Sequence, residues 1–145
     1  MPAKIVPDGY HAVTPYLLVL GVARVVDFLT KTFDATERQR SQMPDGRIAH
    51  VEIVIDGSAI MLGEPPPGMP PVPAALYVYV ADCDATYRRA LAADGISMSE
   101  PADQHYGDRM AGVKDAAGNI WWIGQRKENL TPEEIDRRMK QARKS

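Results

Sequence analysis

Hydrophobic and polar positions follow the same order twice along the chain. Residues 11–21 ("HAVTPYLLVLG") are rich in residues that favour strands, which predicts a strand that ends at Gly21. The next segment, residues 22–35, has apolar residues three and four positions apart, which predicts a helix. In residues 50–55 ("HVEIVI"), apolar and polar residues alternate, which predicts a half-buried strand.

The order begins again after residue 74. Residues 75–84 ("ALYVYVADCD") predict a strand, and the next apolar spacing predicts a helix with Asp84 as its N-cap and Gly95 just past its end. The apolar side of this helix is expected to be Ala85, Tyr87, Ala90 and Leu91. Because "DGSAIMLGE" (56–64) aligns with "AAGNIWWIGQ" (116–125), the chain is predicted to repeat a β-α-β-β-β order.

Two further segments lie outside the repeat. Residues 64–74 ("EPPPGMPPVPA") hold six of the twelve prolines and predict a stiff linker, since proline lacks a donor and has a fixed φ. A PxxP-type ligand for another domain is the alternative. In the tail, Thr131 as N-cap, Pro132 at the first helical position and two acidic residues predict a helix over about 131–143.

Composition narrows the classes of partner. The 145 residues are 45% hydrophobic and 25% charged, with a net charge of -2, so a nucleic-acid partner is not expected. Cys83 is the single cysteine, which excludes an intrachain disulfide and fits a reducing compartment. The apolar run at 16–20 is too short for a signal-peptide core or a membrane span. We therefore expect a cytoplasmic protein that has no membrane partner.

Five motifs carry a resemblance to the vicinal oxygen chelate superfamily, which includes glyoxalases, bleomycin-resistance proteins and extradiol dioxygenases, and within it to the PhnB-like branch. They are "VPDGYHAVTPYLLV" (6–19), "DGRIAHVEIVIDGSAIML" (45–62), "ALYVYVADCDA" (75–85), "DQHYGDRMAGVKDAAGNIWWI" (103–123) and "TPEEIDRRM" (131–139). The resemblance implies one α+β domain in which two βαβββ modules form curved mixed sheets around a cleft. The expected parts are module one at about 10–64, a Pro-rich linker at 65–74, module two at about 75–126 and a C-terminal helix at about 131–143.

One departure concerns the backbone. Asp34 stands where the branch usually has glycine at the end of the first helix. A left-handed conformation is therefore expected at an aspartate, which tolerates it better than most residues do.

In metal-using relatives each module supplies two ligands, and alignment places Thr14, Met61, Ala75 and Trp122 at those positions. Alanine and indole offer no lone pair, and a thioether prefers soft metals. We therefore expect no metal and no other cofactor.

An alternative metal site remains open at this stage. It would need His50, Glu52 and His105 to converge in the fold. Against it, His11 and His105 are expected on exposed loops, and His50 is expected to face the cleft or solvent as a polar residue.

Strand alternation indicates what lines the cleft. Trp121 is expected to face the helix side as a core residue, whereas Trp122 is expected to face the cleft. The candidate ligand-binding residues are Thr14, Tyr16, His50, Glu52, Met61, Tyr77, Tyr79, Tyr106, Arg109 and Trp122. Alternatively, Tyr77 and Tyr79 are simply good strand residues.

Arg109 allows two interpretations. Its planar fork could hold an anionic group of a ligand, or it could pair with Asp108 and stabilise a turn at Gly107.

The resulting hypothesis is a metal-independent small-molecule-binding protein of the glyoxalase/bleomycin-resistance type, with an aromatic or partly apolar metabolite or antibiotic as ligand. The alternative is a metal-free acid–base enzyme of secondary metabolism, isomerase-, epimerase- or cyclase-like, with catalytic candidates His50, Glu52, Tyr106 and Arg109. A metal-dependent lyase or dioxygenase is the third alternative. The resemblance also implies a homodimer.

Overall fold

The computed structural model describes residues 2–144, which fold into two compact units. The first unit runs to Ala74 and includes Ala116–Gly118; the second comprises Ala75–Asp115 and continues from Asn119. The first unit contains β1 (Tyr16–Leu18), α1 (Val22–Phe33), β2 (Thr36–Gln42), β3 (Ile48–Ile55) and β4 (Ser58–Gly63). The second contains β5 (Ala75–Tyr79), α2 (Cys83–Ala92), β6 (Ile96–Asp103), β7 (Asp108–Lys114), β8 (Ile120–Arg126) and α3 (Pro132–Lys144).

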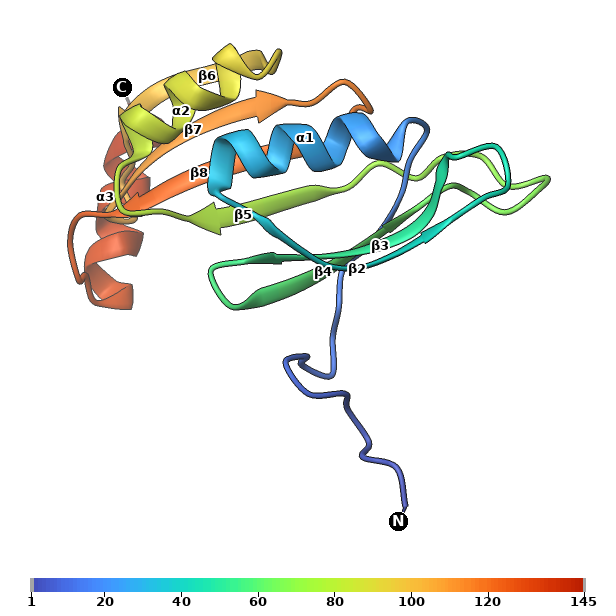
Figure 1. The fold of residues 1–145 in the computed structure, drawn as a ribbon. Coiled ribbons are helices and arrows are strands. Elements are labelled where there is room, and N and C mark those ends of the chain that lie inside the picture. Colours follow the sequence, from blue (N-terminus) through green and yellow to red (C-terminus); the bar gives the residue numbers. More distant parts are fainter. Residues whose placement is uncertain (1, 145) are drawn as a thin grey trace. The chain divides into compact units, whose positions relative to one another are not determined.

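Both units form a four-stranded mixed sheet with the same connections (Figure 1). The strand orders are β1-β4-β3-β2 and β5-β8-β7-β6, and in each sheet the first strand pairs in parallel with the last strand along the chain. The remaining pairs are antiparallel. The predicted α+β fold, with two βαβββ modules and a C-terminal helix, is therefore confirmed.

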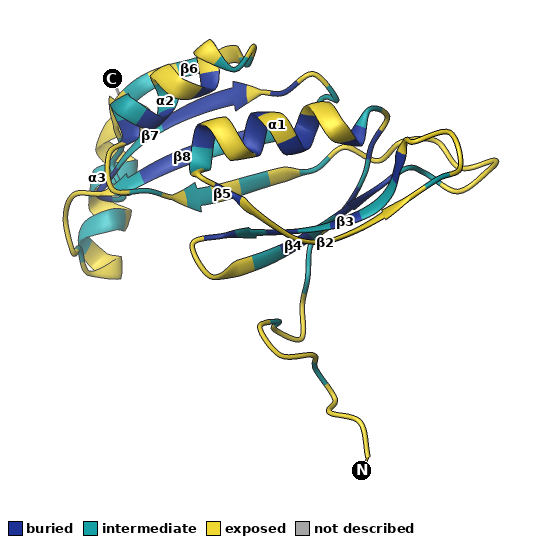
Figure 2. Cartoon of the chain, in the orientation of Figure 1, coloured by how far each residue is buried: buried dark blue, intermediate teal, exposed yellow. Residues whose placement is uncertain are grey.

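The inner strands β3 and β8 largely alternate between buried and more open residues, whereas the edge strand β2 is exposed throughout (Figure 2). In β8, Trp121 and Ile123 are fully buried, whereas Trp122 between them is only half-buried. In the first unit Leu17 is likewise buried beside the exposed Tyr16. The alternation expected for the two tryptophans is thus present in the structure.

The start of α2 corrects one sequence-based expectation. Its N-cap is Asp82, whose carboxylate accepts a hydrogen bond from the Ala85 amide at 3.0 Å. Asp84 instead lies in the first turn and pairs with a strand residue, as described below. The strand before the helix consequently ends at Tyr79, earlier than predicted.

The buried side of α2 also differs from the expected one. The buried residues are Cys83, Thr86 and Ala90, while Leu91 is 38% exposed. The N-cap lies two residues before the expected one, so the buried stripe follows the i, i+3, i+7 series from Cys83.

At the end of α1, Asp34 has a φ of 54° and lies in the left-handed region, as the missing glycine led us to expect. Its backbone N–H donates to the Leu29 carbonyl and closes the helix. β1 is shorter than predicted, because Pro15 has no N–H to donate to a sheet and the strand begins only at Tyr16. Of the helices in the described part of the chain, none is long and apolar enough to cross a membrane.

Candidate functional site

The sheet of the second unit has one face packed against α2, and we call the opposite face the open face. The covered face is identified by contacts to α2: the Cys83 thiol donates to the Ile123 carbonyl at 3.3 Å, and the Cys83 amide donates to the Gln125 side chain at 2.9 Å. Because neighbouring strand residues point to opposite faces, Trp122 and Gly124 belong to the open face.

Aromatic rings cover much of the open face. Tyr77 and Tyr79 of β5 are 38% and 56% exposed, and their ring centroids lie 5.1 Å apart. Trp122 stands directly opposite Tyr77 in the register between β5 and β8. The Tyr77 and Tyr79 rings are tilted by 50° to each other, and each offers an apolar face with a polar edge.

Two glycines allow these rings to lie across the neighbouring strands. A Cβ atom at Gly112 would come within 2.4 Å of the Trp122 ring, and one at Gly124 within 2.2 Å of the Tyr77 ring. Each ring therefore extends over the backbone of the next strand instead of standing upright from its own. The sequence does contain a signal for this arrangement, because strand alternation places both glycines on the same face as the aromatic residues.

A carboxylate lies at one edge of the rings. Asp108, the first residue of β7, is only 1% exposed, and its Oδ2 accepts a hydrogen bond from the Tyr77 hydroxyl at 2.8 Å. The Tyr77 hydroxyl also lies 3.3 Å from that of Tyr106. Burial, followed by the hydrogen bonds to Tyr106 and Asp108, raises the pKa of Tyr77 well above its ordinary value, so this phenol stays protonated.

Asp108 was not among the predicted ligand-binding residues. No pattern marks it, because its partner Tyr77 lies 31 positions away and the two meet only through strand pairing. Among the described residues its Oδ1 atom is buried and has no hydrogen-bond partner. Burying a polar atom without a hydrogen-bond partner costs free energy. This cost distinguishes Asp108 from the tyrosine hydroxyls of the open face.

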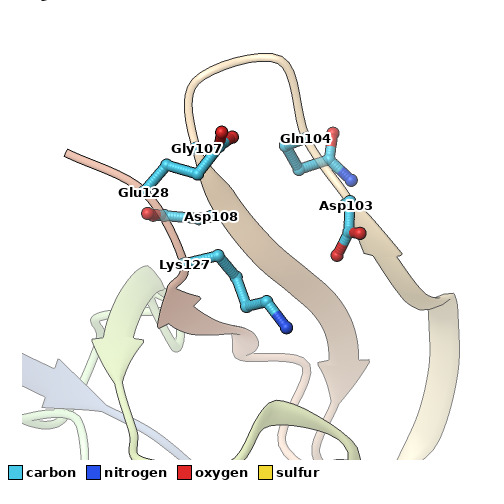
Figure 3. Close-up of a pocket in the computed structure, with 6 residues that line it drawn as sticks. All are labelled: Asp103, Gln104, Gly107, Asp108, Lys127 and Glu128. Atoms are coloured by element: carbon cyan, nitrogen blue, oxygen red, sulfur yellow. The ribbon is translucent and has the colours of Figure 1, made fainter. Parts of the chain in front are cut away.

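A cavity of about 320 Å³ adjoins this region on the turn between β6 and β7. Figure 3 shows its lining side chains, among which Asp108 points away from Asp103 and Gln104. The lining residues are Asp103, Gln104, Gly107, Asp108, Lys127 and Glu128. They are mostly polar, in contrast to the aromatic residues of the open face.

Arg109 lies on the opposite face from Trp122. Its guanidinium pairs with Asp84 of α2 at 2.7 Å and with Asp103 at 3.1 Å. These two carboxylates raise the pKa of Arg109 further above its ordinary range, with Asp84 the larger cause. The expected ion pair between Asp108 and Arg109 is therefore incorrect, because adjacent strand residues point apart and each finds another partner.

The first unit repeats part of the arrangement around Tyr16, the counterpart of Tyr77 in the internal alignment. A Cβ atom at Gly63 would lie 2.9 Å from the Tyr16 hydroxyl. That hydroxyl is 3.3 Å from His50 Nδ1, and the two rings are tilted with centroids 5.6 Å apart. Met61, half-buried, stands opposite Tyr16 in the register. Three predicted residues, Tyr16, His50 and Met61, are thus brought together within this unit.

Glu52 of β3 belongs to a second small cluster in the same unit. Burial and the nearby Glu52 carboxylate raise the pKa of Tyr10 to about 12. The Arg38 guanidinium lies 5.1 Å from the centre of the Tyr10 ring, a cation–π distance. Thr14 is occupied locally, since its hydroxyl donates to the His11 carbonyl at 3.3 Å. The sequence did not mark Tyr10 or Arg38, because they lie in segments without clear periodicity.

The residues that the sequence resemblance places at metal positions do not fit a divalent cation. In the first unit these are Thr14 and Met61, a hydroxyl and a thioether. In the second unit they are Ala75 and Trp122, which have no lone pair to donate. No reaction step can be assigned to a metal held by these side chains.

The alternative metal cluster is not assembled within either unit. His50 and Glu52 lie on β3 of the first unit, whereas His105 lies on the turn between β6 and β7 of the second. His105 is half-buried, not exposed as expected, and its ring stands edge-on to that of Tyr106. Across residues 2–144, no group of three or more His, Cys, Asp or Glu side chains is arranged to hold a metal ion.

Comparison with known proteins agrees with this fold. The sequence model of the Glyoxalase/Bleomycin resistance protein/Dioxygenase superfamily matches residues 11–123. An uncharacterized protein from Mycobacterium bovis is 34% identical over 139 residues, which cover 88% of this chain and 91% of that protein.

Two solved structures illustrate the range of relatives. TnmS3, an antibiotic binding protein from Streptomyces sp. CB03234, has a TM-score of 0.65 at 20% identity, covering 86% of this chain and 100% of its own. A PhnB protein from Bacillus cereus has a TM-score of 0.60 at 19% identity, covering 79% of this chain and 99% of its own. At these identities the likeness concerns the fold alone.

Proposed function

The chain belongs to the Glyoxalase/Bleomycin resistance protein/Dioxygenase superfamily, and from this premise we propose that it is a metal-independent small-molecule-binding protein. Its ligand is a flat, aromatic or partly apolar metabolite or antibiotic. The ligand lies on the open face of the second unit, against Trp122, Tyr77 and Tyr79. A structural relative described as an antibiotic binding protein supports this class of function.

One observation carries the proposal: the rings of Trp122 and Tyr77 lie across glycine backbone. At Gly112 and Gly124 any side chain would collide with these rings. A sheet needs no such arrangement for its own stability, since glycine weakens a strand interior. Flat, partly exposed aromatic rings are, however, the surface on which a planar ligand stacks.

Tryptophan fluorescence tests this proposal directly. A panel of flat aromatic antibiotics and metabolites should quench or shift the emission of the wild-type protein, because the half-buried Trp122 lies in the proposed site. In a Trp122→Phe variant the response should be lost, while the buried Trp121 provides a constant signal. If no compound changes the emission, or if the variant responds like the wild type, the site is not on this face.

Metal independence has its own test. Elemental analysis of protein purified without chelators should find less than one equivalent of zinc, iron, nickel or manganese, because the side chains at the family positions are poor donors. Ligand binding should survive treatment with EDTA. Stoichiometric metal together with loss of binding on chelation would contradict this part of the proposal.

A second candidate function, metal-free acid–base catalysis, is favoured by the contact between the Tyr16 hydroxyl and His50 Nδ1. In that case His50 would move a proton to or from a substrate, with Glu52 on the same strand as a second acid–base group. Once a substrate is found, His50→Ala or Glu52→Ala should lower turnover by at least about a hundredfold. Unchanged turnover in both variants would show that His50 and Glu52 are not the acid–base pair.

A further inference from the structure

We propose that the ligand of the open face carries a cationic hydrogen-bond donor, an amine or amidine attached to its aromatic system. The inference rests on the proposed function and names the ligand class for that same site. It follows from the direction of the hydrogen bonds that end at Asp108. The ligand is received by the outward oxygens of Tyr77 and Tyr106, next to the Asp108 carboxylate.

The hydroxyl protons of Tyr77 and Tyr106 are both used within the protein. A phenol has one proton to donate, and Tyr77 gives its proton to Asp108 Oδ2 at 2.8 Å. In the 3.3 Å contact between Tyr77 and Tyr106, the donor must then be Tyr106. The Tyr106 proton points at the Tyr77 oxygen and the Tyr77 proton points at the carboxylate, so the two oxygens offer a ligand only lone pairs. A ligand that meets them must bring the donor.

Asp108 is 1% exposed, and its Oδ1 is unpartnered among the described residues. The neighbouring Arg109 is turned to the other face and held by two other carboxylates. Arg126 stands opposite Asp108 in the register; its Nε donates to the Asn129 side chain at 3.2 Å, and its guanidinium also acts on the Tyr79 hydroxyl, where it opposes the rise in the pKa of Tyr79. The ion pairs found among the described residues include none to Asp108, so its negative charge is available to attract a cation.

The faces of Tyr77, Tyr79 and Trp122 carry the negative part of the aromatic quadrupole, which attracts cations. Partial burial of the hydroxyl and the nearby Asp108 carboxylate raise the pKa of Tyr79, so this phenol is also neutral at ordinary pH. Aromatic stacking and cation attraction thus favour the same ligand: a planar molecule with a positive charge at its edge.

Isothermal titration calorimetry with three probes of similar shape tests the inference. The probes are 9-aminoacridine, which is a cationic donor at neutral pH, acridine, which is neutral and has only an acceptor nitrogen, and anthracene-9-carboxylate, which is an anion. The wild-type protein should bind 9-aminoacridine at least about tenfold more tightly than acridine, and anthracene-9-carboxylate most weakly. Equal affinities, or preference for the anion, would overturn the inference while leaving an aromatic-binding site in place. Absence of binding by all three would contradict the proposed function as well.

Substitutions then test whether the Asp108 carboxylate causes the preference for 9-aminoacridine over acridine. Asp108→Asn keeps the shape but removes the charge, so the ratio of the two acridine affinities should fall toward one. Asp136→Asn, an exposed change in α3 with the same loss of negative charge, should leave the ratio unchanged. If Asp108→Asn does not fold, Tyr106→Phe serves instead, because it removes the outer acceptor oxygen and should lower the ratio several-fold. A ratio that is the same in wild type and in the folded variant would contradict the role of these groups.

Discussion

Two adjacent tryptophans have different roles in this protein. Trp121 is fully buried, and its indole N–H donates to Asp115 Oδ2 at 2.8 Å. The same carboxylate accepts two hydrogen bonds from Asn119, from the backbone at 3.0 Å and from the side chain at 2.9 Å. Trp122 instead lies across Gly112 on the open face. One residue anchors the core and the turn before β8, and the other forms part of the proposed site.

Asp115→Ala should destabilise the protein. The change removes one acceptor that serves three buried hydrogen bonds, so the free energy of unfolding should fall by about 2–4 kcal/mol. Urea unfolding measures this loss. The exposed Glu100→Ala serves as a control and should change stability by less than about 0.5 kcal/mol. A similar effect of both changes would show that the buried network contributes little.

Gly112→Ala should lower the free energy of unfolding only when Trp122 is present. Its methyl group would lie 2.4 Å from the ring, so we expect a loss of about 1–3 kcal/mol and a shifted tryptophan emission. In a Trp122→Ala background the same change should be nearly neutral, which a double-mutant cycle measures. Additive effects would mean that the ring does not lie over this glycine.

Much of this residue-level picture could be predicted from the sequence, because strand alternation separates Trp121 from Trp122. The polar edge of the site could not be predicted from the sequence, because Tyr77 and Asp108 come together only once β5 and β7 have paired with β8 from its two sides. Strand alternation places the side chains of Asp108 and Arg109 on opposite faces of the sheet, which already argues against an ion pair between these neighbours.

At the scale of elements, the sequence predicts that α2 and α3 each begin after a capping residue, but it does not always identify which residue is the cap. Thr131 caps α3 as expected, with its hydroxyl accepting from the Glu134 amide at 3.2 Å. At α2, however, Asp82 and Asp84 both suit an N-cap, and sequence alone does not choose between them. The choice follows from tertiary structure, because Asp84 is engaged by Arg109 of β7.

The cap assignment is testable with two substitutions at one site. Asp82→Ala should lower the free energy of unfolding by about 1 kcal/mol, since the Ala85 amide loses its acceptor. Asp82→Asn keeps a capping oxygen and should cost only a few tenths. Thermal or urea unfolding distinguishes the two, and equal losses would argue against a cap at this position.

The first turn of α3 should make stability depend on pH in acid. Hydrogen bonds from Arg137, then from Arg138, lower the pKa of Glu134 from 4.5 to about 2. A carboxyl whose pKa is lower in the folded state stabilises it above the unfolded pKa and loses this effect as the pH falls toward the folded pKa. The stability advantage of wild type over Glu134→Gln should therefore be present at about pH 6 and vanish near pH 2.

Urea unfolding at several pH values measures this difference. Glu133→Gln controls for the loss of one negative charge in the same turn. A wild-type advantage that is independent of pH would contradict the account, because the effect would then not arise from ionisation of Glu134.

At the scale of the whole molecule, the repeat predicted from sequence is present as two sheets with the same strand connections. The two units have diverged at equivalent positions: Met61 corresponds to Trp122, and Glu52 to Gly112. The aromatic surface is therefore a property of the second unit.

We also expect a homodimer, so light scattering after size exclusion should give twice the 16.0 kDa of one chain; a mass of 16.0 kDa would contradict this expectation.

The central claim is that ligand binds against Trp122 on the open face, and NMR tests it most directly. Each of the two tryptophans contributes one indole N–H resonance to a ¹H–¹⁵N spectrum, and Trp122→Phe assigns them. On titration with 9-aminoacridine, the Trp122 resonance should shift or broaden with saturation, while that of the buried Trp121 stays nearly unchanged. Equal shifts of both resonances, or a shift of Trp121 alone, would contradict the account.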